Sequence, residues 1–173
     1  MDCIEAINTR RSIRSFLPDE VSPQDIQTIL EAGRYAPTAG NLQPCYFIVV
    51  KDADTIKKIH AATFGQELIA QAPTVIIVCA DPDRCDKYGE KGRQRFSLID
   101  CANATENMLL AAHALGYGAC WVGGFSEKEV RNILSIPETF HVVAMIPIGK
   151  PNGPPVPRIK RPLEEIVRWE KWC

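Results

Sequence analysis

The chain has 173 residues, and its 20 Lys+Arg against 21 Asp+Glu give a formal net charge of −1 at pH 7. This length predicts one domain spanning residues 1–173, and 46% apolar with 24% charged residues is ordinary for a globular protein. The balanced charge argues against binding of nucleic acid or other polyanions, so we expect any bound anion to be small and locally held.

The N-terminal segment MDCIEAINTRRS lacks the apolar core of a signal peptide. No window approaches the roughly 18 unbroken apolar residues of a membrane span. We therefore expect a cytoplasmic protein with no membrane partner.

The seven cysteines have neither C-x-x-C spacing nor a clustered histidine. Most lie in apolar runs, where free cysteine packs as a small hydrophobe, so no metal site is predicted. A cysteine-based metal or redox protein is the alternative interpretation.

Capping patterns mark the first two helices. Asp2 can cap a helix that carries Ile4, Ala6 and Ile7 on one stripe. Ser22, followed by proline and by Asp25 three residues on, opens a second helix. The second helix should end at the proline- and glycine-containing loop 35–44.

The middle of the chain alternates strands and helices. Residues 45–50 and 72–81 are apolar and rich in β-branched side chains, which predicts buried strands, and residues 51–62 predict a short amphipathic helix. Residues 82–96 are polar and broken by glycine, which predicts a surface loop or lid. The longest helix is expected from residue 96 to 115.

Three polar residues interrupt that apolar helix. Asp100, Asn103 and Asn107 fall at i, i+3 and i+7, so they form one polar stripe on an otherwise buried rod. The pattern indicates a central helix with one face against something polar or against a partner subunit.

The last third of the chain predicts two more strands, one more helix and a C-terminal arm. Residues 116–125 predict a turn, a short strand and a glycine turn, Ser126 can cap another helix, and residues 141–149 predict a strand. Residues 150–173 begin proline-rich and end with two tryptophans, which predicts an extended C-terminal arm packed on a neighbouring surface. Because no G-x-G-x-x-G turn opens a helix, a doubly wound dinucleotide fold is disfavoured, and we expect a mixed sheet flanked by helices.

Arginines concentrate after the first helix. Arg10, Arg11 and Arg14 surround Ser12. Cations at a helix C-terminus complement the helix dipole, which is one interpretation. Guanidinium groups with a hydroxyl also suit phosphate oxygens, and Arg10 and Arg14 would share one side if the helix continued.

A second basic group lies in the arm. Arg158 and Lys160 are two residues apart, so an extended backbone points both to the same side. Together with the first cluster they could hold a phosphate from two directions, or they could be solubilising charge on an exposed tail.

Two loops carry further candidates. Thr38, Asn41 and Gln43 offer hydroxyl and amide groups suited to the edge of a planar ring, although such residues also simply form turns. Gly123 and Gly124 would let peptide N–H groups approach a flat ligand, or they form a turn before the next helix.

No nucleophile–base arrangement stands out. The three histidines are scattered, and no serine lies in a G-x-S-x-G elbow. We therefore predict no catalytic side chain, and in an enzyme the chemistry would belong to a cofactor.

Taken in order, four motifs resemble the flavin-dependent nitroreductase family. They are TRRSIRSF, APTAGNLQPCYFIVV, IDCANATENMLLAAHALGYGACWVGGF and IGKP…RIKRPLEEIV, which together span nearly the whole chain. The resemblance implies an α+β fold, a homodimer with one FMN at each of two subunit interfaces, and a C-terminal arm exchanged across that homodimer. It also implies an enzyme in which flavin N5 takes hydride from NAD(P)H and passes electrons to a small acceptor by a ping-pong mechanism.

The resemblance also implies roles for individual residues. Arg10, Arg11, Ser12 and Arg14 match the motif that binds the FMN phosphate, ribityl chain and pyrimidine edge, and Arg158 and Lys160 match the basic pair that completes the phosphate site. Asn41 and Gln43, in the loop that also contains Thr38, match the loop that meets the flavin from the other subunit. Gly123 and Gly124 match the segment beside flavin N5 and O4.

The chain departs from the family pattern at two places. Cys45 and Tyr46 follow N-x-Q-P where many members have tryptophan, and residues 81–95 are the one candidate for the segment that shapes the substrate mouth. The acceptor could therefore be a nitroaromatic, a quinone or a flavin. A non-catalytic flavin-binding protein on the same fold is the alternative.

Overall fold

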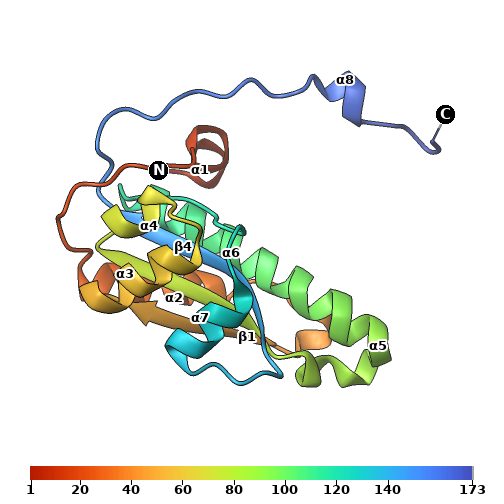
Figure 1. Cartoon of the computed structure of the whole chain (residues 1–173). Coiled ribbons are helices and arrows are strands. Elements are labelled where there is room, and N and C mark those ends of the chain that lie inside the picture. The colour runs from red at the N-terminus through yellow and green to blue at the C-terminus, as the bar shows by residue number, and fades with distance from the viewer. Residues whose placement is uncertain (173) are drawn as a thin grey trace.

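A computed structural model describes residues 1–172 as helices packed on a four-stranded sheet (Figure 1). The helices are α1 (Cys3–Thr9), α2 (Pro23–Arg34), α3 (Ala53–Ala62), α4 (Glu67–Gln71), α5 (Gly89–Lys91), α6 (Ser97–Ala114), α7 (Glu127–Leu134) and α8 (Leu163–Ile166). Shorter helical turns are η1 (Ala39–Asn41), η2 (Pro82–Tyr88) and the π-helical η3 (Gly92–Phe96). The strands are β1 (Cys45–Val50), β2 (Thr74–Ala80), β3 (Gly118–Ala119) and β4 (His141–Gly149).

The strand order in the sheet is β1-β2-β4-β3, and each neighbouring pair runs antiparallel. The α+β class is confirmed. The expected mixed sheet differs from these ladders, since within residues 1–172 the one parallel pairing is an isolated bridge between Ser12 and Ala119. The successive strands β1 and β2 pair antiparallel although α3 and α4 lie between them in the sequence.

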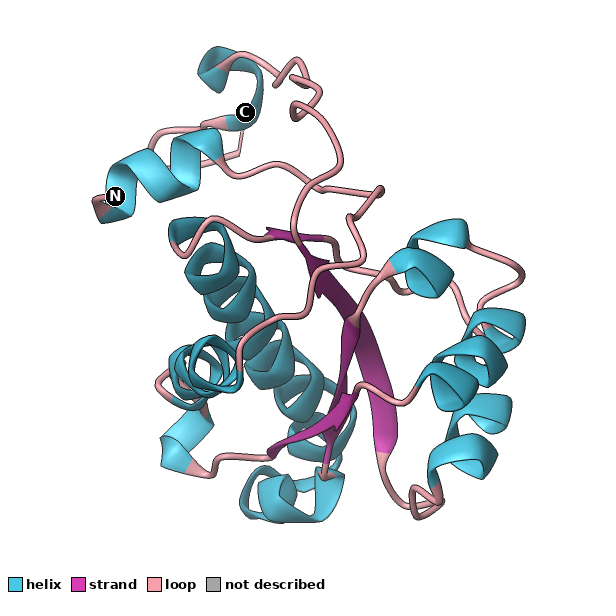
Figure 2. Ribbon diagram, turned by 90° about the vertical axis from the view of Figure 1, so that its left-hand side faces the viewer, coloured by secondary structure: helices cyan, strands magenta, loops and turns pink. Residues whose placement is uncertain are grey.

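The sheet lies between two layers of helices, as Figure 2 shows. Alternate side chains of β2 face opposite sides: Val75 and Ile77 join a core with residues of α3, α4 and α7, whereas Ile76 and Val78 join a core with residues of α2 and α6. Every residue of β2 is buried, which explains its unbroken apolar sequence.

The predicted helix starts are confirmed. Asp2 accepts a hydrogen bond from Glu5 N (2.9 Å), and Ser22 Oγ accepts one from Asp25 N (3.0 Å). Ser126 Oγ accepts from Glu129 N at 3.4 Å. These side chains satisfy backbone donors that the first helical turn leaves unpaired.

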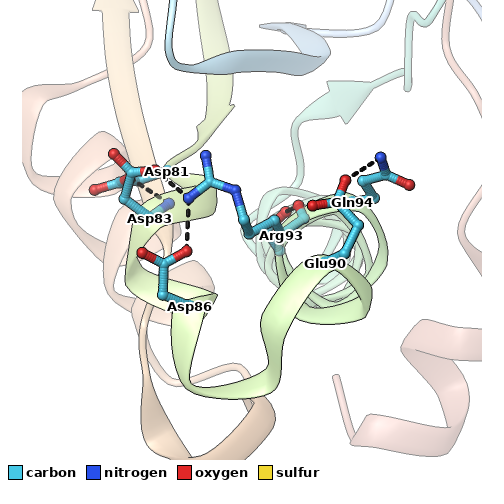
Figure 3. Close-up of polar contacts among 7 residues, drawn as sticks. Asp81, Asp83, Asp86, Glu90, Arg93 and Gln94 are labelled. Carbon is cyan, nitrogen blue, oxygen red and sulfur yellow. Dashed lines mark hydrogen bonds and ion pairs between the residues drawn. The ribbon is translucent and has the colours of Figure 1, made fainter.

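The surface loop or lid expected over residues 82–96 does lie at the surface, but a loop is wrong, because this segment forms η2, α5 and η3 and runs directly into α6. Figure 3 shows the polar contacts that hold it: Arg93 Nη1 pairs with Asp83 Oδ1 (2.5 Å) and Asp86 Oδ1 (2.6 Å), and Gln94 donates to Glu90. Gly92 is required here because a Cβ would lie 2.2 Å from the carbonyl oxygen of Cys85. The glycine that suggested a loop instead permits close packing.

The predicted arm extends from the body of the molecule, as Figure 1 shows. Beyond the isolated Phe16–Pro151 bridge the chain is exposed, and one short helix, α8, interrupts it. Its large apolar side chains are open to solvent, including Ile159, Leu163, Trp169 (86% exposed) and Trp172 (88% exposed). Cys173 lies outside the described residues. The apolar side chains of the arm therefore have no surface to pack against within their own chain.

Candidate functional site

The arginine motif is an extended segment. Helix α1 ends at Thr9, and the backbone of Arg10 (φ −53°, ψ 134°) leaves the helical region. The helix therefore does not continue as far as Arg14, so the pairing of Arg10 and Arg14 on one helix face does not occur. In an extended segment, Arg10, Ser12 and Arg14 instead alternate with Arg11 and Ile13.

The sheet edge anchors this segment. Ile13 N donates to Ala119 O at 3.0 Å, beside the parallel bridge between Ser12 and Ala119. Gly118 allows the close approach, because a Cβ at that position would lie 2.7 Å from the Ile13 side chain. The strand β3 thus places the arginine motif at the end of the sheet.

The start of the arm pairs with the other end of the same segment. Leu17 N donates to Lys150 O (2.9 Å), and Asn152 N donates to Ser15 O (3.0 Å). Two stretches that are far apart in the sequence are therefore held side by side by backbone hydrogen bonds.

A cavity of about 430 Å³ opens between them. Five of its lining residues are cationic, and within the described chain its lining contains no aspartate or glutamate. The volume lies in the range of small-molecule sites, about 300–1,000 Å³. The lining residues are Arg10, Arg11, Ser12, Ile13, Arg14, Ser15, Asn152, Gly153, Pro154, Pro155, Val156, Arg158 and Lys160.

The cations of the cavity differ in how firmly they are held. Arg10 Nε lies 3.3 Å from Glu106 Oε1 on α6, and Arg11 Nη1 donates to the carbonyls of Asn8 (2.8 Å) and of Arg10 (2.7 Å). Within residues 1–172 neither Arg158 nor Lys160 has a hydrogen bond or ion pair. The arm therefore contributes positive charge that nothing in its own chain neutralises.

His113 on α6 supports the beginning of the motif. Thr9 Oγ1 donates to Glu5 O (2.6 Å), so the 2.8 Å contact between Thr9 Oγ1 and His113 Nε2 requires the imidazole to donate. Burial, followed by the charges of Arg10 and Arg11, lowers the pKa of His113 below its usual 6.5. The neutral ring is therefore the form that suits the folded chain.

We expect the free energy of unfolding to decrease as the pH falls below about 6.5, because the unfolded chain then binds a proton on His113 that the folded chain resists. The measurement is urea unfolding at about pH 7.5 and 5.5. His113→Gln retains a donor for Thr9 but cannot titrate, so it should reduce this decrease. An equal decrease in the variant would contradict the assignment.

The loop that carries Thr38, Asn41 and Gln43 has a tight backbone. Asn41 (φ 57°) and Gln43 (φ 50°) both adopt left-handed conformations, and Gln43 N donates to Thr38 Oγ1 at 3.2 Å. The strained turn directs the two amide side chains to the surface, where both residues are exposed.

The polar stripe of α6 forms hydrogen bonds with the backbone that leads from α2 into this loop. Asp100 accepts from Ala39 N at 3.0 and 3.1 Å, Asn103 Nδ2 donates to Pro37 O at 3.4 Å, and Asn107 Nδ2 donates to Ala32 O at 3.1 Å. Burial raises the pKa of Asp100, and the hydrogen bond from Ala39 opposes that rise. The predicted polar neighbour of the stripe is thus the backbone at the end of α2 and the start of the loop.

Asn107→Ala should lower the free energy of unfolding by about 1 kcal/mol, because it leaves a part-buried carbonyl of α2 without its donor. Asn103→Ala is the matched control, since its bond is longer and exposed and should contribute less. If chemical denaturation gives the two variants the same loss of unfolding free energy, the hydrogen bond to Ala32 contributes no more than the bond to Pro37.

The loop and the cationic cavity lie at opposite ends of the sheet. Cys45, directly after the loop, pairs with Ala80 at the end of β2, whereas Ile148 beside the cavity pairs with Thr74 at its start. The length of β2 separates them by roughly 20 Å. One chain therefore brings together the arginine motif and the basic pair of the arm, and does not bring loop 38–43 to them.

Gly123 and Gly124 follow the bridge between Val122 and Met145, at the sheet edge formed by β3. Gly124 O accepts from Gln66 Nε2 at 2.6 Å, which fixes the turn. Both glycines are exposed, and in the described chain neither peptide N–H has a protein acceptor. Their N–H groups are free to meet a ligand.

Some cavity residues were not selected from the sequence. Ser15, Asn152 and Gly153 line the cavity because the arm pairs with the arginine motif. The Asn-Gly pair shortly after β4 could have indicated a turn here, and Gly153 does have a φ of 103°.

Within residues 1–172, no group of three or more His, Cys, Asp or Glu side chains is arranged to hold a metal ion. No helix in this part of the chain has the length and apolar character needed to cross a membrane.

Comparison with known proteins identifies the family. The family model described as Nitroreductase family matches residues 7–66 and 60–150, which include the arginine motif, the loop and the glycine turn. The chain belongs to the nitroreductase family.

Individual relatives align with most of this chain. A protein of Archaeoglobus fulgidus with the provisional name NADH dehydrogenase/NAD(P)H nitroreductase is 43% identical over 87% of this chain and 86% of its own length. An FMN reductase [NAD(P)H] of Bacillus subtilis is 27% identical over 99% of this chain and 74% of its own. The crystal structure of a nitroreductase family protein from Clostridium difficile superposes with a TM-score of 0.89 at 29% identity, covering 99% and 100% of the two chains.

Proposed function

We propose that this nitroreductase is an FMN-dependent enzyme that uses NAD(P)H as electron donor. The observation that carries the proposal is the cavity of five cations, built where the arginine motif meets the arm. The relatives named as NAD(P)H nitroreductase and FMN reductase support the same cofactor and donor.

The residues present fit FMN. A phosphate monoester carries close to two negative charges, and Arg10, Arg14, Arg158 and Lys160 can compensate them by charge-assisted hydrogen bonds. Arg11 and Ser12 add donors along the same wall, where the ribityl chain and pyrimidine edge would lie. Arg158 and Lys160, which have no partner within residues 1–172, would pair with the phosphate.

FMN supplies hydride and electron transfer at its N5 atom when bound. The chain contributes orientation: the free N–H groups of Gly123 and Gly124 can donate to the ring edge that holds N5 and O4. Thr38, Asn41 and Gln43 would cover the ring from the partner subunit. No side chain of this chain is assigned a proton-transfer role.

We infer a homodimer from the separation of loop and cavity. Because loop 38–43 lies at the far end of the sheet from the five cations, a site that uses both needs two chains. The exposed apolar arm offers the means, since exchange between subunits would cover Leu163, Trp169 and Trp172. We place this dimer in the cytoplasm, with residues 1–173 as one domain and 150–173 as the exchanged arm.

The acceptor would react after oxidised nicotinamide leaves, in a ping-pong sequence. Nitroaromatics, quinones and free flavins are the candidate acceptors. The segment η2–α5–η3 lies beside loop 38–43, since a Cβ on Gly40 would meet Tyr88 and Lys87, and we expect it to shape acceptor choice.

The test is direct. The purified protein should be yellow, and anaerobic NADH or NADPH should bleach the flavin bands, followed by recovery when an acceptor is added in stopped flow. A colourless protein that does not take up FMN would overturn the cofactor assignment. A yellow protein whose colour both nicotinamides leave unchanged would overturn the oxidoreductase assignment and favour a flavin-binding protein.

A further inference from the structure

Two cysteines from different elements are in direct contact. Cys45 opens β1 and Cys101 lies in the first half of α6, and their Sγ atoms are 3.2 Å apart. The Cys101 thiol donates to the Cys45 sulfur, with Cys79 O as a second acceptor at 3.5 Å. Both cysteines are free thiols in this structure.

The two thiols differ in access. Cys45 is half-buried and lines a cavity of about 230 Å³ together with Arg34, Arg84 and Gln43. Cys101 is fully buried behind it. A solute in the cavity therefore meets Cys45, whereas Cys101 does not line the cavity.

The described residues offer no metal site at this contact. Cys79 and Cys85 are neighbours of the pair, yet residues 1–172 contain no group of three ligating side chains arranged around a metal position. Burial raises the pKa of Cys79 to about 11, which disfavours the thiolate that a metal requires. A pair of thiols remains, of which Cys45 is half-buried and Cys101 is fully buried.

We propose that Cys45 and Cys101 form a dithiol site that reduces a low-molecular-weight disulfide and closes to an intramolecular disulfide. The Cys45 thiolate attacks one sulfur of the external disulfide, whose S–S bond breaks and releases one thiol. The Cys101 sulfur then attacks Cys45 and displaces the second thiol, and its proton passes to the departing thiolate. Two protein thiols are oxidised, and one disulfide is reduced to two thiols.

The geometry favours closure over a lasting adduct. The two sulfur atoms must move from 3.2 Å to about 2.05 Å, a shift of roughly 1 Å. The hydrogen bond to Cys45 and burial raise the pKa of Cys101, so it does not start the exchange but is already placed to finish it. Arg84 at the cavity has no carboxylate partner within residues 1–172, so it favours an anionic reagent such as oxidised glutathione, whereas Arg34 is already paired with Glu31 at 2.7 Å.

Closure would join the exit of loop 38–43 to the helix that already holds its entry through Asp100. The chemistry itself requires no flavin, although the cavity is lined by Thr38 and Gln43, which the proposed function places over the flavin of the partner subunit. Reduction by dithiothreitol should restore both thiols.

The experiment treats the native full-length protein with oxidised glutathione, then alkylates the remaining thiols in denaturant and maps peptides by mass spectrometry. We expect a cross-linked peptide containing Cys45 and Cys101. Cys101→Ser should instead retain glutathione on Cys45, and Cys45→Ser should leave Cys101 open to alkylation. Cys3→Ser, which changes an exposed cysteine outside the pair, should cross-link like the parent.

The parent protein alone can overturn the proposal, even if a variant fails to fold. A stable glutathione adduct on Cys45 without the cross-link would contradict closure. Alkylation of both Cys45 and Cys101 after glutathione has modified exposed Cys3 would contradict the site itself.

Discussion

Replacing Arg158 by alanine is expected to weaken FMN binding by about tenfold to hundredfold, the loss of one charge-assisted hydrogen bond to phosphate. Arg158 lines the cationic cavity, yet within residues 1–172 it has no partner of its own. The substitution should therefore change cofactor affinity and leave the melting temperature of the flavin-free protein unchanged. Fluorescence titration of the flavin-free protein measures the affinity.

Arg168→Ala is the matched control, because Arg168 lies on the same arm and stacks on Trp172 without lining the cavity. It should retain FMN like the parent. If the Arg158 variant binds FMN as tightly as the Arg168 variant, the phosphate site has been assigned to the wrong residues. Arg10→Ala should also lose affinity, but its ion pair with Glu106 makes that variant less specific.

Ending the chain after Pro162 is expected to dissociate the dimer and to weaken FMN retention. The deletion removes the exposed apolar residues Leu163, Ile166, Trp169 and Trp172, but it keeps Arg158 and Lys160. Fully burying each such side chain contributes about 1.5–3 kcal/mol, so their loss should be decisive for the proposed arm exchange. Sedimentation equilibrium, followed by flavin titration, measures both effects.

Lys171→Ala, a change of charge at the end of the same arm, serves as a control and should leave the dimer intact. The core clusters contain no residue beyond 162, so the shortened chain should still fold. A dimer that persists after the deletion would show that other surfaces hold the subunits together and that the arm has another role.

Much of the fold could be predicted because its signals are local. Caps at Asp2, Ser22 and Ser126 mark helix starts, and the unbroken apolar run of β2 marks a strand with both faces buried. The loop predicted for residues 82–96 was wrong because the structure of this segment depends on contacts that are not local. Their helical turns depend on Arg93 reaching two aspartates and on Gly92 packing against a carbonyl, contacts that composition does not reveal.

The candidate site was predictable only in part. The sequence suggested two basic clusters for one phosphate, and the structure places both around one cavity because backbone hydrogen bonds join Ser15 to Asn152 and Leu17 to Lys150. The end of α1 at Thr9 could not be foreseen from the arginines themselves. The distance between loop 38–43 and the cavity is a property of the sheet, which no local pattern encodes.

Helix α6 contacts both regions, one at each end. Asp100 holds the loop, whereas His113 holds Thr9 at the start of the arginine motif, and an α-helix rises about 20 Å between these two positions. A single rigid element therefore acts as a spacer with a fixed length. In a two-fold dimer, the same spacer would determine how far apart the two flavins lie, so an insertion or deletion within α6 would put both sites out of register at once.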